Sequence, residues 1–205
     1  GAPEPIFAFD KYGYATLNTM YSIVIKDTEK YSYKYLLALL CSSMIKKWWL
    51  SLFSDNKDLF PKIKGNQLKE IPIKAIPISE QQLFIALADQ MLSLSTDLQT
   101  KRQRFLKRLS DNFNVTTNNG ACPIVITNAL EHFDTLEFKQ FLAELKKQKI
   151  TLSLKQQDEW EEYFNAYKAE CSNFVSQIAE TDKEIDRLVY GLYGLTEEEI
   201  NVIDK

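Results

Sequence analysis

The stretch WEEYFNAYKAECSNFVSQIAETDKEIDRLVYGL, residues 160–192, repeats mostly apolar side chains at alternating steps of four and three residues. This spacing puts them on one face of an α-helix and is typical of the heptad seam of a coiled coil. Such a helix would be roughly 48 Å long, at 1.5 Å per residue. The stripe consists of Trp160, Phe164, Tyr167, Cys171, Phe174, Ile178, Thr181, Ile185, Leu188 and Leu192.

A second stripe with the same spacing comes earlier in the chain. It comprises Phe84, Leu87, Met91, Leu94, Leu98, Lys101 and Phe105. Two such stripes predict an antiparallel helical hairpin, a two-stranded coiled coil. Because polar side chains in a seam penalise slipped pairings, Lys101 and Thr181 are predicted to help fix the register.

Residues 111–154 interrupt this hairpin and are predicted to form a small cap at its tip. NVTTNNGACP, residues 114–123, reads as a loop by composition. TLEFKQFLAELKK, residues 135–147, predicts a short helix with one apolar face, made by Phe138, Phe141, Leu142 and Leu145.

Helix ends are marked by capping boxes, in which a Ser or Thr is followed three residues later by Glu or Gln. They begin at Ser79, Ser153 and Thr196. Gly194 suits a helix stop, and Ile200 and Ile203 would dock a last helical turn on the body.

The first part of the chain has a different pattern. Residues 5–26 predict a β-hairpin or short meander, and residues 32–53 predict one helix with Ser32 as N-cap. Residues 71–78 predict an extended segment, which its two prolines confine to a sheet edge. The spacing of the nearby aromatic residues favours core packing over base stacking; they are Trp48, Trp49, Phe53 and Phe60. The predicted class is α+β, with a domain at 1–78, a helical hairpin at 79–205 and the cap at 111–154.

Charge is unevenly distributed along the chain. Residues 1–110 contain 16 Lys and Arg against 10 Asp and Glu, whereas residues 111–205 contain 9 against 18, for a net charge of −3. A positive first half indicates a polyanionic partner, although chance segregation on solvated surfaces would give the same pattern.

Cysteine usage and hydropathy bear on location. The three cysteines have no paired spacing, so they are predicted to be reduced core residues in a cytoplasmic protein. The longest apolar stretch, residues 35–45, is shorter than the roughly 20 residues that a membrane span needs. No signal peptide is recognised, and no membrane partner is expected.

The sequence shows no constellation typical of an enzyme. His132 is the only histidine, glycines are scattered singly, and metal-site, nucleophile and phosphate-loop motifs are not found. We therefore expect no catalysis and no cofactor in this chain alone.

The segment PKIKGNQLKEIPI, residues 61–73, is the candidate DNA-binding site. Lysines neutralise phosphates, and an Asn or Gln amide can bond an adenine edge through two atoms. The predicted contacts are Lys57, Lys62, Lys64 and Lys69 to phosphates, with Asn66 and Gln67 at base edges. Gly65 would allow close backbone approach. The alternative is an ordinary solvated loop.

A second basic cluster, KRQRFLKR at 101–108, lies on the first long helix. It could clamp a DNA backbone, or its side chains could pair with acidic residues such as Glu170 on the neighbouring helix. We favour the intramolecular pairing.

Several segments resemble known restriction–modification proteins. LKEIPIKAIPISEQQLFI, residues 68–85, is similar to the end of the target recognition domain in type I restriction specificity subunits, and YKYLLALLCSSMIKKWW, residues 33–49, resembles a helix of that family. LSLKQQDEWEEYFNAYKAEC, residues 152–171, and ETDKEIDRLVYGLYGLTEEEI, residues 180–200, resemble the C-terminal tail of single-chain type IIG enzymes. Cys41 and the Lys74–Ile76 run depart from the family pattern.

The resemblance implies a DNA target recognition domain followed by a helical spacer. The methyltransferase and nuclease of such enzymes are N-terminal and use S-adenosylmethionine and Mg²⁺. This sequence shows neither an Asn-Pro-Pro-Tyr motif nor a PD-ExK motif, so we expect a fragment of a restriction endonuclease and DNA adenine methyltransferase. Its expected function is to recognise a specific sequence in double-stranded DNA and to position the catalytic parts there. The alternative is a coiled-coil module that binds protein and no nucleic acid.

Overall fold

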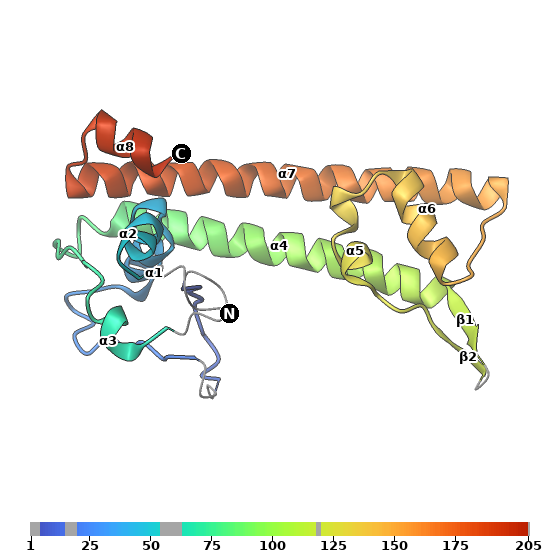
Figure 1. Ribbon diagram of the computed structural model, residues 1–205, viewed down its shortest axis with the longest axis horizontal. Helices are drawn as coiled ribbons and strands as arrows, with labels where there is room; N and C mark the ends of the chain where they lie inside the picture. The colour runs from blue at the N-terminus through green and yellow to red at the C-terminus, as the bar shows by residue number, and fades with distance from the viewer. Residues whose placement is uncertain (1–4, 15–19, 54–62, 118–119, 205) are drawn as a thin grey trace. The chain divides into compact units, whose positions relative to one another are not determined.

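The computed structural model describes residues 5–14, 20–53, 63–117 and 120–204, with the backbone alone for 114–117 and 120–122. Most of this part of the chain is helical (Figure 1). The elements are α1 (Tyr33–Cys41), α2 (Ser43–Phe53), α3 (Gly65–Leu68), α4 (Gln82–Asn112), β1 (Asn114–Thr117), β2 (Gly120–Pro123), α5 (Asn128–Glu131), a 3-10 turn (Phe133–Thr135), α6 (Phe138–Lys147), α7 (Leu154–Tyr193) and α8 (Glu197–Ile203).

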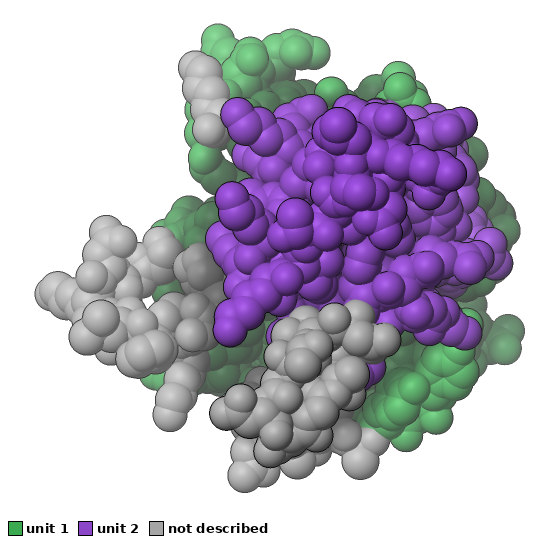
Figure 2. Space-filling view, turned by 90° about the vertical axis from the view of Figure 1, so that its right-hand side faces the viewer, with its two compact units in different colours: residues 1–91, 180–205 green, residues 92–179 purple. Residues whose placement is uncertain are grey.

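The chain forms two compact units, coloured separately in Figure 2. Unit 1 consists of residues 1–91 and 180–205, and unit 2 consists of residues 92–179. The long helices α4 and α7 contribute residues to both units, so each unit has its own helical core.

The predicted α+β class is wrong. In residues 5–14, 20–53 and 63–78, the described part of the predicted recognition domain, the regular elements are helices and no strand occurs. The described residues contain one small β-hairpin, formed by β1 and β2 in unit 2, with Val115 paired to Cys122. It lies within the stretch that composition predicted to be a loop.

Residues 5–26 do not form the predicted hairpin or meander in their described part, because side chains take up the backbone groups that a ladder would use. The Asp10 carboxylate accepts hydrogen bonds from the amides of Tyr12, Gly13 and Tyr14. The Tyr33 hydroxyl accepts one from the Ile25 amide, 3.1 Å away. The β-propensity of such a segment is overridden when no partner strand is available.

The core of unit 1 joins four helices. It contains Tyr35 and Leu39 from α1, Ile45 and Trp49 from α2, Phe84 and Leu87 from α4, and Ile185 and Val189 from α7. Trp49 is 3% exposed, while Trp48 and Phe53 pack against the same core, so the core interpretation of these three is confirmed. Phe60 lies outside the described residues.

The single helix predicted at 32–53 is broken in two at Ser42, with a 60° bend between α1 and α2. Ser32 is the N-cap of α1, as predicted, since its side chain accepts a bond from the Lys34 amide. At the break, the Ser42 hydroxyl donates to the Leu39 carbonyl, and Asp186 of α7 accepts from the Ser43 amide at 2.8 Å. The Asp186 carboxylate thus serves the first turn of α2 from another helix.

Residues 71–78 form a strap held by side chains, and no strand of the described residues lies beside it. Tyr35 donates to the Lys74 carbonyl at 2.6 Å, and Tyr193 donates to the Pro72 carbonyl. Gln81, which is fully buried, accepts from the Ser32 amide and donates to the carbonyls of Lys30 and Ile76. One amide side chain therefore ties the strap to the start of α1.

The predicted helix ends are partly confirmed. Reciprocal capping bonds occur between Ser153 and Gln156 and between Thr196 and Glu199, and Gly194 ends α7 with φ near +70°. Ile200 and Ile203 pack against the core, as predicted. The box predicted at Ser79 is wrong: α4 begins at Gln82, and Gln82 donates to the Ile78 carbonyl.

The core of unit 2 is rich in aromatic residues. Phe105 of α4 is fully buried and stacks on Phe133, with ring centroids 3.7 Å apart. The predicted apolar face of α6 is confirmed, since Phe141 and Leu145 are buried while Phe138 and Leu142 pack beside them. Tilted ring contacts link Phe141 on this face to Trp160 and Phe164 of α7.

Within each unit, α4 and α7 run antiparallel. In unit 2, Lys101 bridges Glu170 while Phe113 contacts Trp160, so rising numbers on α4 meet falling numbers on α7. In unit 1, Gln90 donates to the Thr181 hydroxyl at 3.1 Å. Lys101 and Thr181, the polar residues of the two stripes, thus each have a partner on the opposite helix. Such a partner is needed if these residues are to fix the register.

No helix in the described ranges is by itself long and apolar enough to cross a membrane. Taken together, the bent pair α1 and α2 passes that test by length and composition.

Candidate nucleic-acid interface

Four of the six predicted DNA-binding residues lie on or beside α3. Lys64 precedes the helix and Lys69 follows it, and both side chains are exposed, as is Asn66. A single helical turn therefore brings two cations and one amide to the surface of unit 1. Lys57 and Lys62 lie outside the described residues.

Gln67 has a local role in this turn. Its side-chain oxygen accepts a hydrogen bond from the Lys64 amide, at 2.8 Å, and so caps the start of α3. This bond uses one of the two lone pairs of the amide oxygen and fixes the side chain against the backbone, so Gln67 is less free than Asn66 to turn toward an adenine edge. Asn66 remains exposed and suits that contact better.

Gly65 lies against a tyrosine. A Cβ atom at this position would be 3.2 Å from Cε1 of Tyr21, which is tighter than ordinary packing. The Tyr21 hydroxyl donates to the Ile63 carbonyl at 3.2 Å. The absence of a side chain at Gly65 thus lets the segment around Tyr21 pack against α3, and the free approach predicted for a ligand is occupied by that ring.

Sequence reasoning missed the exposed apolar side chains of residues 20–24. Met20, Tyr21 and Val24 are 64%, 52% and 72% exposed, which is unusual for large apolar side chains in so short a segment. Their exposure results from the lack of a partner strand, and no pattern in the sequence indicates that lack. Of these residues, Tyr21 contacts the α3 turn and adds an aromatic ring to its exposed basic and amide side chains.

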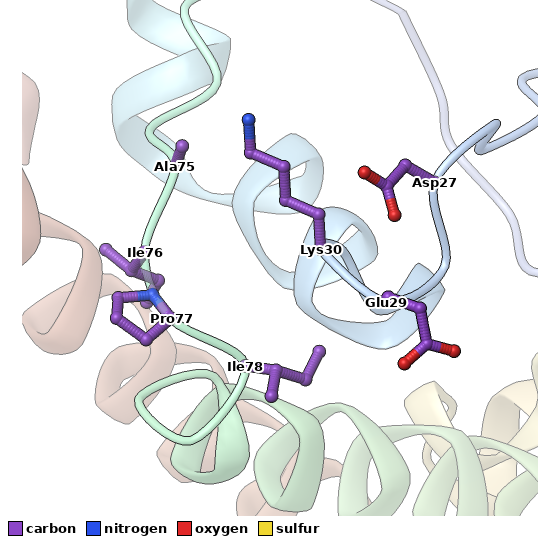
Figure 3. A pocket seen from close by; sticks show the side chains of 7 residues that line it. All are labelled: Asp27, Glu29, Lys30, Ala75, Ile76, Pro77 and Ile78. Carbon is purple, nitrogen blue, oxygen red and sulfur yellow. The ribbon is translucent and has the colours of Figure 1, made fainter.

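Another surface feature of unit 1 has the wrong charge for DNA. A pocket of about 420 Å³ lies between the turn at 27–30 and the strap at 75–78. Figure 3 shows the carboxylates of Asp27 and Glu29 on the turn side, with Ile76, Pro77 and Ile78 opposite. Lys30 also lines the pocket, but the two carboxylates outnumber its one ammonium, and a net negative charge repels phosphates, so this pocket is not assigned to the interface.

The basic cluster at 101–108 is partly used inside unit 2. Lys101 bridges Glu170 on α7, as predicted, and lies over the ring of Tyr167 at 4.3 Å. Arg102 pairs instead with the buried Asp134 of the cap, through two bonds of 2.8 and 2.7 Å. Arg104 and Lys107 are exposed.

The described residues contain no cluster of three His, Cys, Asp or Glu side chains that could hold a metal ion. Cys171 is fully buried in the core of unit 2, as predicted for a small apolar residue, whereas Cys41 is exposed and the core prediction is wrong for it. Burial raises the pKa of its thiol to about 11, and Asp134 adds to the effect. The nucleophilic thiolate is therefore disfavoured at neutral pH.

Comparisons with known proteins divide the chain near the strap. Residues 2–73 match the model of the TaqI-like C-terminal specificity domain, and residues 77–189 match the domain of unknown function DUF8810. Neither the curated proteins nor the solved structures gave a match. The α3 surface thus lies in a specificity domain of the restriction–modification type, and because the second match spans more than half of its length, the chain belongs to the DUF8810 family.

Proposed function

We propose that this chain recognises a specific sequence in double-stranded DNA through its first 73 residues. The observation that supports this most strongly is the match of residues 2–73 to a specificity domain, since that range contains every predicted DNA contact. The exposed Lys64 and Lys69 on either side of α3 add the cations that phosphate binding requires.

In this proposal the lysines position the DNA and Asn66 reads a base. Lys64 and Lys69 would each neutralise one phosphate, and Asn66 would bond a base edge in the major groove. Gln67 would play a smaller part, because its side-chain oxygen already caps α3. Lys57 and Lys62 enter the proposal on sequence grounds alone.

The proposal extends to a parent restriction–modification enzyme of the type IIG or type I kind. Helices α4 and α7 would act as the spacer that holds the recognition part at a set distance from a methyltransferase and a nuclease. Those parts would use S-adenosylmethionine and Mg²⁺. The described residues offer no carboxylate cluster that fits Mg²⁺, so no catalytic step is assigned to them.

The first experiment exposes the purified chain to a pool of duplexes with a randomised centre and sequences the retained DNA. We expect one short sequence to be enriched. No retention, or retention without enrichment, would contradict sequence-specific recognition and favour a coiled-coil module that binds protein.

The second experiment measures affinity for the enriched duplex at several salt concentrations. Replacing Lys64 and Lys69 together with Ala should weaken binding and lower the salt slope by about 1.8, near 0.9 for each lost phosphate contact. The matched control is Lys139→Ala with Lys146→Ala, two exposed lysines of α6 in unit 2. An unchanged slope in the α3 variant would mean that these lysines do not touch DNA.

A further inference from the structure

Residues 10–14, with the sequence DKYGY, form a well-organised loop in unit 1; we call it the tyrosine loop. The Asp10 carboxylate accepts hydrogen bonds from three successive amides, those of Tyr12, Gly13 and Tyr14, at 2.7 to 3.0 Å. Gly13 has φ near +72°, a conformation that L side chains rarely adopt, so glycine is required at this turn. The loop is therefore held by specific bonds, even though it belongs to no helix or strand.

The tyrosine loop presents its side chains to solvent. Tyr12 and Tyr14 are 70% and 72% exposed, with ring centroids 5.7 Å apart in an edge-to-face arrangement. The Lys11 ammonium lies 5.0 Å from the centroid of the Tyr12 ring. Two aromatic rings and a cation are thus exposed side by side. The two hydroxyl groups and the ammonium can each donate a hydrogen bond to an anionic ligand.

The Asp10 carboxylate would repel a phosphate, and its hydrogen bonds to backbone amides weaken that repulsion. Asp10 directs both carboxylate oxygens at backbone amides, whose partial positive charges offset its own. The same bonds lower the pKa of Asp10, with the Tyr12 amide as the largest cause. Asp10 is itself exposed, and beside it the loop turns Lys11 and the two tyrosines outward.

We propose that the tyrosine loop is a second DNA contact of the recognition domain, a proposal that rests on the proposed function. Lys11 would bond a phosphate, while Tyr12 and Tyr14 would place their hydroxyls on phosphate oxygens or base edges and their rings against sugars. Because Asp10 and Gly13 fix the loop in advance, binding loses little conformational entropy. Asp10 is the positioning residue of this contact.

A protein partner is the rival occupant of such an exposed aromatic surface. Duplex DNA is favoured because the loop pairs its rings with a cation, and because it lies inside the range that matches the specificity domain. The first 110 residues also carry more basic than acidic side chains, 16 against 10.

The test uses the full chain and the duplex enriched by the wild type. Tyr12→Ala with Tyr14→Ala should weaken binding at least tenfold with little change in salt slope, since rings and hydroxyls carry no charge. Tyr12→Phe with Tyr14→Phe separates the hydroxyls from the rings. Lys11→Ala should lower the salt slope by about 0.9 and weaken binding to all sequences alike.

Asp10→Asn keeps both tyrosines but weakens the bonds that fix the loop, so it should reproduce much of the loss of DNA affinity seen when both tyrosines are replaced with Ala. Its second readout is amide hydrogen exchange at Tyr12, Gly13 and Tyr14, which should become faster. The controls are Leu83→Ala and Lys183→Ala, an exposed apolar and an exposed basic side chain of α4 and α7 in unit 1. Thermal melting shows that each variant is folded.

The two proposals fail in different ways. If the wild type selects a sequence but the Tyr12/Tyr14 and Lys11 variants bind it equally well, the tyrosine loop is not a DNA contact and the proposed function stands. If the wild type retains no duplex, both proposals are overturned.

Discussion

In unit 1, single side chains hydrogen-bond several backbone groups of irregular segments. Gln81 serves three backbone groups at once, and Asp10 serves three others. A buried amide or carbonyl without a partner costs about 1–3 kcal/mol, so the bonds of the buried Gln81 stabilise the irregular segments that it joins. The bonds of Asp10 are exposed and fix the local turn at residues 10–14.

Asp186 is a buried carboxylate whose charge affects stability. Its carboxylate is 9% exposed on α7 and accepts a bond from the Ser43 amide at the start of α2. Burial raises its pKa, the bonds to Ser43 oppose this, and the nearby carboxylates Asp182 and Asp204 raise it further. The folded state therefore binds the Asp186 proton more tightly than the unfolded state does.

The pH dependence follows from that direction. As pH rises above the ordinary value of 3.8, the unfolded state ionises first, so the free energy of unfolding falls until the folded carboxyl has ionised too. Asp186→Asn keeps an oxygen for the Ser43 amide and removes the buried charge. We expect it to be more stable than the wild type at pH 7, by a margin that disappears as pH falls below 3.8.

Urea unfolding at a series of pH values checks this prediction. Asp97→Asn, an exposed position on α4, is the charge-matched control. A wild-type protein more stable than Asp186→Asn at neutral pH would show that the attraction of the carboxylate for the α2 terminus outweighs its burial.

At the scale of elements, helix ends were predictable where the capping residues are free to cap. Ser153 and Thr196 lie on exposed chain and form their boxes. Ser79 has the same local pattern, but the buried Gln81 is needed by α1 and the strap, so α4 starts later. A capping motif thus predicts the helix start wrongly when a side chain within it is hydrogen-bonded to distant parts of the chain.

Two glycines near the end of α7 should respond oppositely to substitution. Gly194 ends the helix with φ near +70°, where Ala is strained, so Gly194→Ala should destabilise unit 1 by about 1 kcal/mol. Gly191 lies inside α7, and a Cβ there would meet nothing within 4 Å. Gly191→Ala should therefore stabilise the helix by about 0.5–1 kcal/mol.

Urea denaturation, monitored by circular dichroism, gives the free energy of unfolding of the wild type and of each variant. The two variants add the same methyl group three residues apart, so each is the control for the other. Equal signs would mean that α7 does not end at Gly194 in solution.

For the whole molecule, the sequence predicted what is periodic and missed what depends on distant partners. The apolar stripes of α4 and α7 are local signals, and they are buried or half-buried along their lengths. The strap depends on Tyr35 and Tyr193, of which the second lies more than a hundred residues away, and no local pattern reveals that. The small β-hairpin was missed because its polar composition also suits a loop.

The candidate site was predictable to a similar extent. Exposed Lys64, Asn66 and Lys69 follow from composition, because polar loop residues are usually solvated. The tyrosine loop was hidden, since alternating aromatic residues also predict a strand. Asp10 followed three residues later by Gly13 was the available signal, as Asp side chains cap turns in which glycine takes a positive φ.

The whole molecule also offers a test of where DNA contact ends. Arg104 and Lys107 are exposed on the part of α4 that belongs to unit 2, and the described residues show no salt bridge for either. If recognition belongs to residues 2–73, replacing both with Ala should leave affinity for the enriched duplex within about twofold, and the salt slope unchanged within error. Lys64→Ala with Lys69→Ala removes the same charge from unit 1 and should lower the slope by about 1.8. Equal losses in the two variants would extend the phosphate-binding surface along α4, and the helices would then bind DNA in addition to their proposed role as a spacer.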